Sequence, residues 1–389
     1  MFEYIPLALI AIVFFSWCID YINGFHDTAN AIATVVSTGV LPAKYAIMMA
    51  AGLNFVGALV GTAVATTIAK GLADTVHMVP AVVMAALLAA IFWDLLTWWF
   101  GLPSSTSHTL MGGIAGAVAA HAGLSALNWV KLREIAVFIV VSPITGFVVA
   151  AFLIILLLWI VRRMSTHRVN FVFRKLQLVS ASAMAFTHGQ NDAQKAMGVI
   201  CLGLIIYGFL HSVPGANVAV PLWVKIGCAT MMGMGTAAGG WKIIKTLGHK
   251  IAKLKPIHGF AAETAAALVL FTTAHMGVPV STTHSISGAI MGVGASMNPK
   301  AVRWGLAGNI FVAWLLTIPV SAMLSAFFYF ALAWCAPSLT HAPILKLKTD
   351  VNAMAADVSV QAADAGVQAT DASVQATDAG VRMVGQCQP

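Results

Sequence analysis

Long apolar stretches separated by short polar connections fill most of this 389-residue chain. The clearest cover residues 5–22, 45–68, 79–100, 134–161, 198–211, 220–238, 258–276 and 304–335. A helix needs about 20 apolar residues to cross a bilayer, and a chain in lipid must pair its backbone groups internally. The pattern therefore predicts an all-α polytopic membrane protein.

Composition agrees with that prediction and excludes other classes. Hydrophobic residues make up 60% of the chain and charged residues 9%, whereas roughly a quarter of a soluble domain is charged. A cytosolic enzyme and a nucleic-acid-binding protein are therefore excluded. Because basic loops remain on the cytoplasmic side of a membrane, two basic clusters are expected there: Arg162, Arg163, Arg168, Arg174 and Lys175, then Lys242, Lys245, Lys250, Lys253 and Lys255.

Two pairs of segments reveal an internal repeat. The segment Gly24-Phe-His-Asp-Thr-Ala-Asn-Ala31 aligns with Gly189-Gln-Asn-Asp-Ala-Gln-Lys-Ala196 at an offset of 165 residues. The segment at 103–114 aligns with 279–290 at an offset of 176, with six of twelve positions identical. We predict one transmembrane repeat at 1–160, a basic cytoplasmic connecting loop at 161–175 and a second transmembrane repeat at 176–335. Residues 350–389 form a low-complexity, heptad-like tail whose thin apolar seam favours disorder or a loose helix.

Polar segments lie inside the apolar stretches at equivalent places in the two repeats. Residues 23–27 and 187–192 are expected to interrupt their helices, because paired broken helices build the substrate site of many secondary transporters. The Ser/Thr-rich segments at 104–107 and 281–283 add hydroxyl donors where new helices are expected to begin, which favours an anion. The candidate substrate-binding residues are Ser105, Thr106, Ser107, Ser281, Thr282, Thr283 and Asn191.

Five acidic residues lie in apolar context: Asp20, Asp27, Asp94, Asp192 and Glu263. A carboxylate at membrane depth costs at least ~2.5 kcal/mol, so each is a functional candidate. Asp27 and Asp192 lead because they occupy equivalent repeat positions, whereas Glu263 could equally be a structural hydrogen-bonding acid. The candidate coupling residues are Asp27, Asn30, Asp192, Lys195 and Glu263. We predict no catalytic residue and no metal site, and we interpret His108 and His284 as hydrogen bonders at helix starts, with a proton relay as the alternative.

These motifs resemble those of the PiT family of inorganic phosphate transporters, in particular its bacterial PitA-like low-affinity permeases. The two signature segments, Gly240-Trp-Lys-x-x-Lys-Thr-x-Gly248, Glu263-Thr-Ala-Ala266 and Pro279-Val-Ser-Thr-Thr-His284 are similar to family motifs in the same order. The resemblance implies inverted repeats, two re-entrant hairpins at the Ser/Thr motifs and a homodimer in the bacterial inner membrane. It also implies cation-coupled import of inorganic phosphate without a cofactor, with a divalent metal as a candidate companion of the phosphate.

Three residues depart from the family pattern: His26, Gln190 and Lys195. Lys195 occupies the repeat position of Asn30, and an ammonium group supplies no oxygen ligand to sodium while it repels a cation. We therefore predict proton symport, with a tethered cation at Lys195.

Other readings remain open on the sequence alone. The alternatives within transport are a sulfate permease, a sodium-coupled phosphate symporter and an ion channel. A remote alternative is an intramembrane hydrolase that pairs Ser105 or Ser281 with His108 or His284, but the chain has no Gly-x-Ser-x-Gly elbow.

Overall fold

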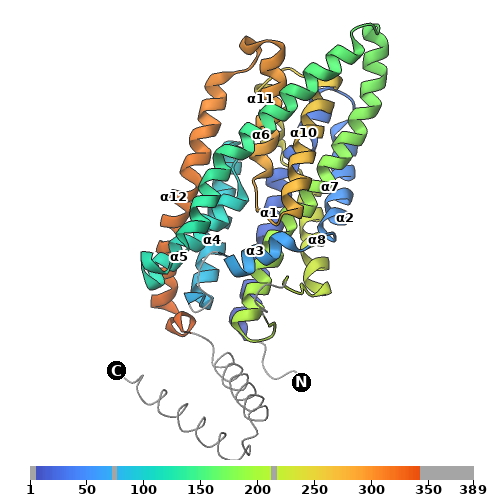
Figure 1. Ribbon diagram of the computed structural model, residues 1–389. Coiled ribbons are helices and arrows are strands. Elements are labelled where there is room, and N and C mark those ends of the chain that lie inside the picture. Colours follow the sequence, from blue (N-terminus) through green and yellow to red (C-terminus); the bar gives the residue numbers. More distant parts are fainter. Residues whose placement is uncertain (1–5, 72–76, 212–216, 342–389) are drawn as a thin grey trace, which may run out of the picture.

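The structure, a computed structural model, describes residues 6–71, 77–211 and 217–341, and the predicted tail at 350–389 lies outside these ranges. Helices account for nearly all of the described secondary structure (Figure 1). They are α1 (Leu7–Ser37), α2 (Ala43–Ala58), α3 (Ala63–Gly71), α4 (Pro80–Phe100), α5 (Thr106–Ala122), α6 (Trp129–Val161), α7 (Thr166–Ile206), α8 (Leu222–Ala238), α9 (Trp241–Lys245), α10 (Pro256–His275), α11 (Thr282–Met297) and α12 (Trp304–Cys335), with short η helices at Leu124–Ala126, Thr246–Lys250, Pro299–Ala301 and Pro337–Thr340.

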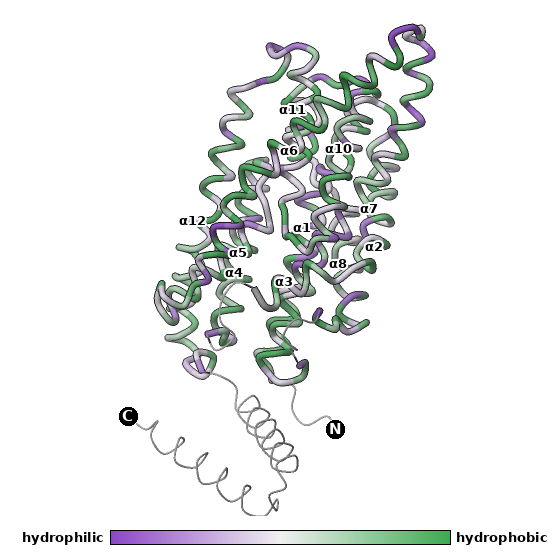
Figure 2. The backbone as a smooth tube through the Cα atoms, in the orientation of Figure 1, coloured by the Kyte–Doolittle hydropathy of each residue, from purple (hydrophilic) through white to green (hydrophobic). Residues whose placement is uncertain are grey.

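The predicted all-α, multi-span membrane fold is confirmed. Among the described residues, α1, α4, α6, α10 and α12 are long and apolar enough to cross a membrane, and α2 with α3 adds a sixth candidate as a bent pair. Apolar residues run along the outward helices α6 and α12, whereas the turn that joins α6 to α7 is hydrophilic (Figure 2).

The two halves of the chain pack crosswise. Helix α5 packs against α12, and α11 packs against α6. Glycine permits both close approaches: an added Cβ on Gly116 would lie 2.1 Å from the carbonyl oxygen of Ala322, and one on Gly292 would lie 2.2 Å from that of Phe147. Gly116 and Gly292 are 176 residues apart, the offset of the Ser/Thr motifs.

The predicted interruptions at 23–27 and 187–192 are wrong. Helix α1 continues through the first segment and α7 through the second. Gly24 serves close packing there, because an added Cβ would lie 2.4 Å from the carbonyl oxygen of Met232 in α8. The polar side chains bond to other helices, as described below, so the backbone of α1 and α7 keeps its own hydrogen bonds.

The broken helix lies elsewhere, between α2 and α3, which meet at an angle of 68°. Gly61 takes a positive φ of 87° at this break, a conformation that glycine adopts without strain. The side chain of Gln194 in α7 accepts a hydrogen bond of 2.9 Å from the backbone N–H of Val64. Helix α7 thereby satisfies an amide at the start of α3 that the helix itself leaves unpaired.

The connection between the two halves is shorter than the predicted loop at 161–175. Helix α6 ends at Val161 and α7 begins at Thr166, where the Ser165 side chain accepts from the backbone N–H of Arg168 at 3.4 Å. The segment contains no Gly or Pro, and its Arg and Lys residues are good helix formers. Most of the basic cluster therefore lies on the first turns of α7. The apolar stretch at 198–211 likewise belongs largely to α7 and is not a separate span.

Candidate functional site

Two buried carboxylates meet at the centre of the helical bundle. Asp27 in α1 is 2% exposed and Asp192 in α7 is 1% exposed. The Thr282 hydroxyl lies 3.4 Å from Oδ2 of Asp27 and 3.2 Å from Oδ2 of Asp192. The two repeat-related acids are thus joined through one hydroxyl from α11.

Both Ser/Thr motifs lie at helix starts, as predicted. Helix α5 begins at Thr106 and α11 at Thr282. The side chain of Ser105 accepts from the backbone N–H of His108 at 3.4 Å, and Ser281 accepts from that of His284 at 3.2 Å. Both serines act as N-caps, and the positive ends of both helix dipoles therefore lie at the motifs.

The second motif contacts α1 directly. The Asn30 side chain donates to the hydroxyls of Thr283 at 2.9 Å and Thr282 at 3.3 Å. The Thr283 hydroxyl donates in turn to Oδ2 of Asp27 at 3.2 Å. Asn30 and Asp27 lie one turn apart on α1, so the start of α11 bonds to one face of that helix.

The first motif reaches Asp192 through Asn23. The Thr106 hydroxyl donates to Oδ1 of Asn23, and the Asn23 amide donates to Oδ2 of Asp192, both at 3.2 Å. Asn23 is absent from the predicted site residues, although its spacing of four from Asp27 places both on one helix face.

Ser107 and Asn191 meet on the backbone before α11. Ser107 donates to the carbonyl oxygen of Val280 at 3.2 Å, and the Asn191 amide donates to the same oxygen at 3.3 Å. Asn191 also donates to Oδ1 of Asp192 at 3.1 Å. These bonds connect the starts of α5 and α11 to α7.

Lys195 forms a buried ion pair with Asp192. Its ammonium nitrogen lies 2.6 Å from Oδ1, and Lys195 is 2% exposed. The His188 ring, one turn earlier on α7, lies 3.6 Å from Oδ2 of Asp192. One ligand atom each from Asp27, His188 and Asp192 lies within 4.8 Å of the others, close enough to surround one cation. Lys195 already places a positive charge on this cluster.

His26 extends the network from Asp27 towards α4. Its Nδ1 lies 2.7 Å from Oδ1 of Asp27, and its Nε2 lies 3.2 Å from the Thr97 hydroxyl and 3.3 Å from the Ser104 hydroxyl. His26 is therefore a hydrogen bonder in the site. Asp94 accepts from the Thr109 hydroxyl at 3.1 Å at the edge of this network.

Glu263 lies apart from the two central acids. Its carboxylate accepts from the hydroxyls of Thr34 and Ser180 and from the Gln177 amide at 3.0 Å. Thr34 is seven residues beyond Asp27 on α1, about 10 Å along the helix axis. No hydrogen bond among the described residues joins Glu263 to Asp27 or Asp192, so its carboxylate forms a separate buried site.

His108 and His284 pack together instead of facing the capping serines. Their ring centroids are 4.8 Å apart, and His284 stacks on Trp314 of α12 at 3.9 Å. A Ser–His dyad needs the hydroxyl bonded to the ring. Among the hydrogen bonds of the described chain, Ser105 and Ser281 have no histidine ring as a partner, which removes the hydrolase alternative's geometric basis.

Buried carboxylates and hydroxyl-bearing helix starts inside a multi-span helical bundle are typical of membrane transporters. A family model described as the phosphate transporter family matches residues 23–325. The chain belongs to this family, as the sequence motifs predict, and membership identifies a transporter and not an enzyme.

Individual relatives agree. Proteins named probable low-affinity inorganic phosphate transporter match from Rhizobium meliloti, 48% identical over 326 residues (84% of this chain, 96% of the relative), and from Bacillus subtilis, 48% identical over 328 residues (84% and 97%). A solved structure named the sodium-dependent phosphate transporter matches with a TM-score of 0.77 at 25% identity, covering 85% of this chain and 100% of the solved one.

Proposed function

We propose that this protein imports inorganic phosphate across the bacterial inner membrane by proton symport. The observation that carries the proposal is the Thr282 hydroxyl, which lies within hydrogen-bonding distance of both Asp27 and Asp192. A phosphate ion bound to this hydroxyl senses the charge state of both acids. Such coupling between the phosphate site and the proton site is what a symporter requires.

The substrate donors in this proposal are the hydroxyls and backbone N–H groups at the two helix starts together with one amide. They are Ser105, Thr106, Ser107, Ser281, Thr282, Thr283 and Asn191. Hydroxyl and amide donors at positive helix ends bind a tetrahedral oxyanion without a full counter-charge. Ser105 and Ser281 also cap their helices, so they hold the donor geometry as well.

Charge repulsion supplies the coupling. Two like unit charges 5 Å apart repel by roughly 3 kcal/mol at an effective dielectric constant of 20. Lys195 offsets the charge of Asp192, which leaves Asp27 to be neutralised before a phosphate anion binds beside it. A proton on Asp27 removes this repulsion, so proton and phosphate binding favour one another. Asn30 holds Thr282 and Thr283 against Asp27, while Glu263 belongs to a separate proton-binding position.

The proposed architecture is a pair of inverted repeats, 1–160 and 176–335, assembled as a homodimer. The packing of α5 against α12 and of α11 against α6 supports this architecture. In each case, the helix that begins at a Ser/Thr motif packs against the last helix of the other half. The segments α4–α5 and α10–α11 then form two re-entrant hairpins whose tips meet at the site. The basic turn after α6 lies on the cytoplasmic side.

Sodium coupling is the second candidate. The Asp27, His188 and Asp192 cluster and the name of the matched solved structure favour it. Against it, Lys195 supplies a fixed positive charge at Asp192. A divalent metal carried with phosphate is compatible with either coupling ion.

Uptake of labelled phosphate by purified protein in proteoliposomes tests the substrate. We expect saturable uptake that excess sulfate leaves largely intact. Sulfate that competes as strongly as unlabelled phosphate would instead identify a general oxyanion carrier.

A further inference from the structure

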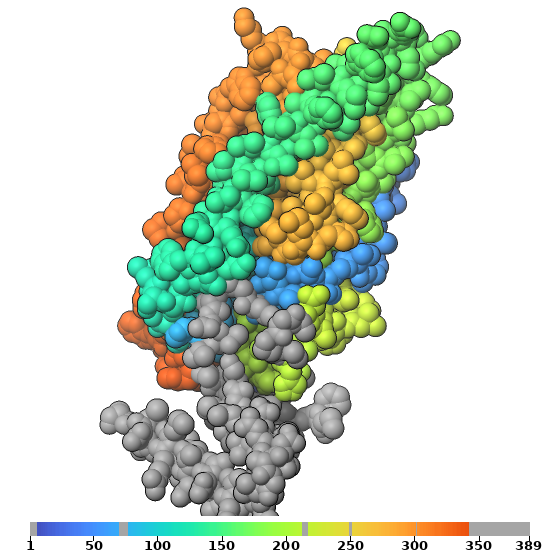
Figure 3. Space-filling model, in the orientation of Figure 1, coloured from blue at the N-terminus to red at the C-terminus, as the bar shows by residue number. Residues whose placement is uncertain are grey.

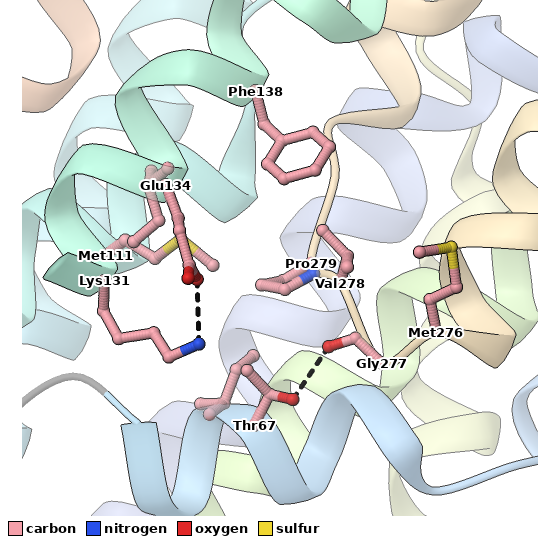
Figure 4. A pocket seen from close by; sticks show the side chains of 11 residues that line it. Thr67, Met111, Lys131, Glu134, Phe138, Met276, Gly277, Val278 and Pro279 are labelled. Atoms are coloured by element: carbon pink, nitrogen blue, oxygen red, sulfur yellow. Dashed lines mark hydrogen bonds and ion pairs between the residues drawn. The ribbon is translucent and has the colours of Figure 1, made fainter.

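A cavity of about 140 Å³ lies between α3, α5, α6 and the extended segment that leads into α11. Figure 4 shows Lys131 and Glu134 of α6 facing Thr67 of α3 and the backbone of Gly277 across this space. Figure 3 shows α6, α10 and α3 meeting on this face of the molecule. The volume is enough for several water molecules.

Lys131 is the one cation among the described residues that line the cavity. Its ammonium nitrogen lies 2.8 Å from Oε2 of Glu134, and the two side chains are 40% and 50% exposed. Such water-exposed pairs are weak, so the ammonium can exchange its carboxylate for another anion. Most of the other lining residues are apolar, and apolar walls strengthen the pull of a charge on a small ion.

The cavity lies next to the candidate site. Met111 lines it and lies one turn after Ser107 on α5, so the two residues share a helix face. Pro279 also lines it and directly precedes Val280, whose carbonyl oxygen accepts from Ser107 and Asn191. One helical turn and one residue therefore separate the cavity from the hydroxyl cluster.

Helix α3 closes the remaining side. The Thr67 hydroxyl donates to the carbonyl oxygen of Gly277 at 2.8 Å and ties α3 to the segment before α11. The start of α3 is held in turn by Gln194, the neighbour of Lys195 in α7. Helix α3 is therefore tied both to the segment that leads into α11 and to α7.

We propose that this cavity is the access site from which an oxyanion enters the transporter, with Lys131 as its first anion contact. The inference rests on the proposed function, since it concerns the path of the same phosphate. The cavity lies at the end of α6 opposite the basic turn. Because the positive-inside rule assigns that turn to the cytoplasm, the cavity opens to the outside. Glu134 holds Lys131 when the site is empty and releases it to the arriving anion.

Paired charge-removing variants test the role of Lys131. In proteoliposomes at low ionic strength, Lys131→Gln should raise half-saturation for phosphate roughly threefold to tenfold, with the maximal rate retained. Arg133→Gln removes the same charge from an exposed residue outside the cavity lining and should behave like the wild type. Glu134→Gln should lower half-saturation, because it frees the ammonium. Equal half-saturation in Lys131→Gln and Arg133→Gln would overturn the proposal, whereas absence of phosphate uptake by the wild type would instead overturn the proposed function.

Chemical restoration of the charge gives a second test. Lys131→Cys should show the weakened half-saturation, and modification with a thiol reagent that adds an ethylammonium group should restore it. A reagent that adds an ethylsulfonate should weaken it further. The wild type, treated in parallel, controls for native thiols such as the exposed Cys335. Equal effects of the cationic and anionic reagents would reject an electrostatic role.

Discussion

At the scale of single residues, Thr282 and Thr106 occupy equivalent repeat positions but make unequal contacts. Thr282 contacts both carboxylates, whereas Thr106 reaches Asp192 only through Asn23. Loss of a hydrogen bond to a charged group costs about 1.5–3 kcal/mol. We therefore expect Thr282→Ala to raise half-saturation for phosphate roughly tenfold or more, and Thr106→Ala to raise it less. Initial uptake rates over a phosphate series measure this, with the exposed Thr272→Ala as control; unchanged half-saturation in both variants would exclude these hydroxyls.

Asp27 differs from Asp192 in that no lysine contacts its carboxylate within the part of the chain that the structure describes. Its partners there are the His26 ring and two threonine hydroxyls. Asn fits the same space but cannot bind and release a proton. Asp27→Asn should therefore abolish gradient-driven accumulation of phosphate, because transport loses its coupling group. Accumulation in proteoliposomes with an imposed proton gradient measures it, and exchange of internal for external phosphate checks that substrate still binds. Wild-type accumulation would remove Asp27 from the coupling mechanism.

Lys195 is the residue for which folding and coupling are hardest to separate. Removal of one partner from a buried ion pair costs about 3–5 kcal/mol, because the other charge remains unpaired. We expect Lys195→Asn to lose proton-driven uptake or to gain sodium dependence, since Asn supplies an oxygen ligand. The double variant Lys195→Asn with Asp192→Asn removes both charges of this ion pair and therefore controls for instability. A Lys195→Asn protein with wild-type, sodium-independent uptake would show that the ammonium has no coupling role.

At the scale of helices, the sequence predicts where polar residues gather but not whether a helix breaks there. The starts of α5 and α11 are predicted correctly because Pro followed by Ser and Thr is a local capping signal. The predicted breaks in α1 and α7 are wrong because the polar side chains of Asn23 and Asp192 form hydrogen bonds with other helices. No local sequence pattern reveals these bonds. The break between α2 and α3 is not predicted, since its capping group, Gln194, lies far away in the sequence.

The crossing of α11 and α6 makes a prediction about stability. An added Cβ on Gly288 would lie 2.2 Å from the carbonyl oxygen of Pro143, so the helices would have to separate. Overpacking of this kind costs about 1–3 kcal/mol, and Gly288→Ala should lower the thermal midpoint in detergent. Gly305 in α12 has open space around an added Cβ, so Gly305→Ala should leave the midpoint unchanged or raise it. Equal midpoints for the two variants would show that the crossing tolerates a methyl group.

At the scale of the whole molecule, the repeat predicts which residues meet, although their positions are far apart in the chain. Asp27 and Asp192 belong to different halves and come together at the centre, with hydroxyls from both helix starts around them. Glu263 does not join them, because its place on α10 faces α7 at a different level from Asp192. The sequence motif around Glu263 indicates a polar position. Only the packing of α10 shows that this position lies apart from Asp27 and Asp192.

The charge balance of the assembled site decides which gradient drives transport. Two carboxylates and one ammonium are buried together, so one further positive charge neutralises them, and the fixed ammonium disfavours a metal cation nearby. We expect phosphate accumulation in proteoliposomes to follow an imposed proton gradient and to be insensitive to a sodium gradient at constant pH and membrane potential. Choline-containing buffer on both sides provides the sodium-free control. Accumulation that requires sodium in the unmodified protein would reject proton coupling and the tethered-cation role of Lys195 together, while leaving the phosphate donors at the two helix starts intact.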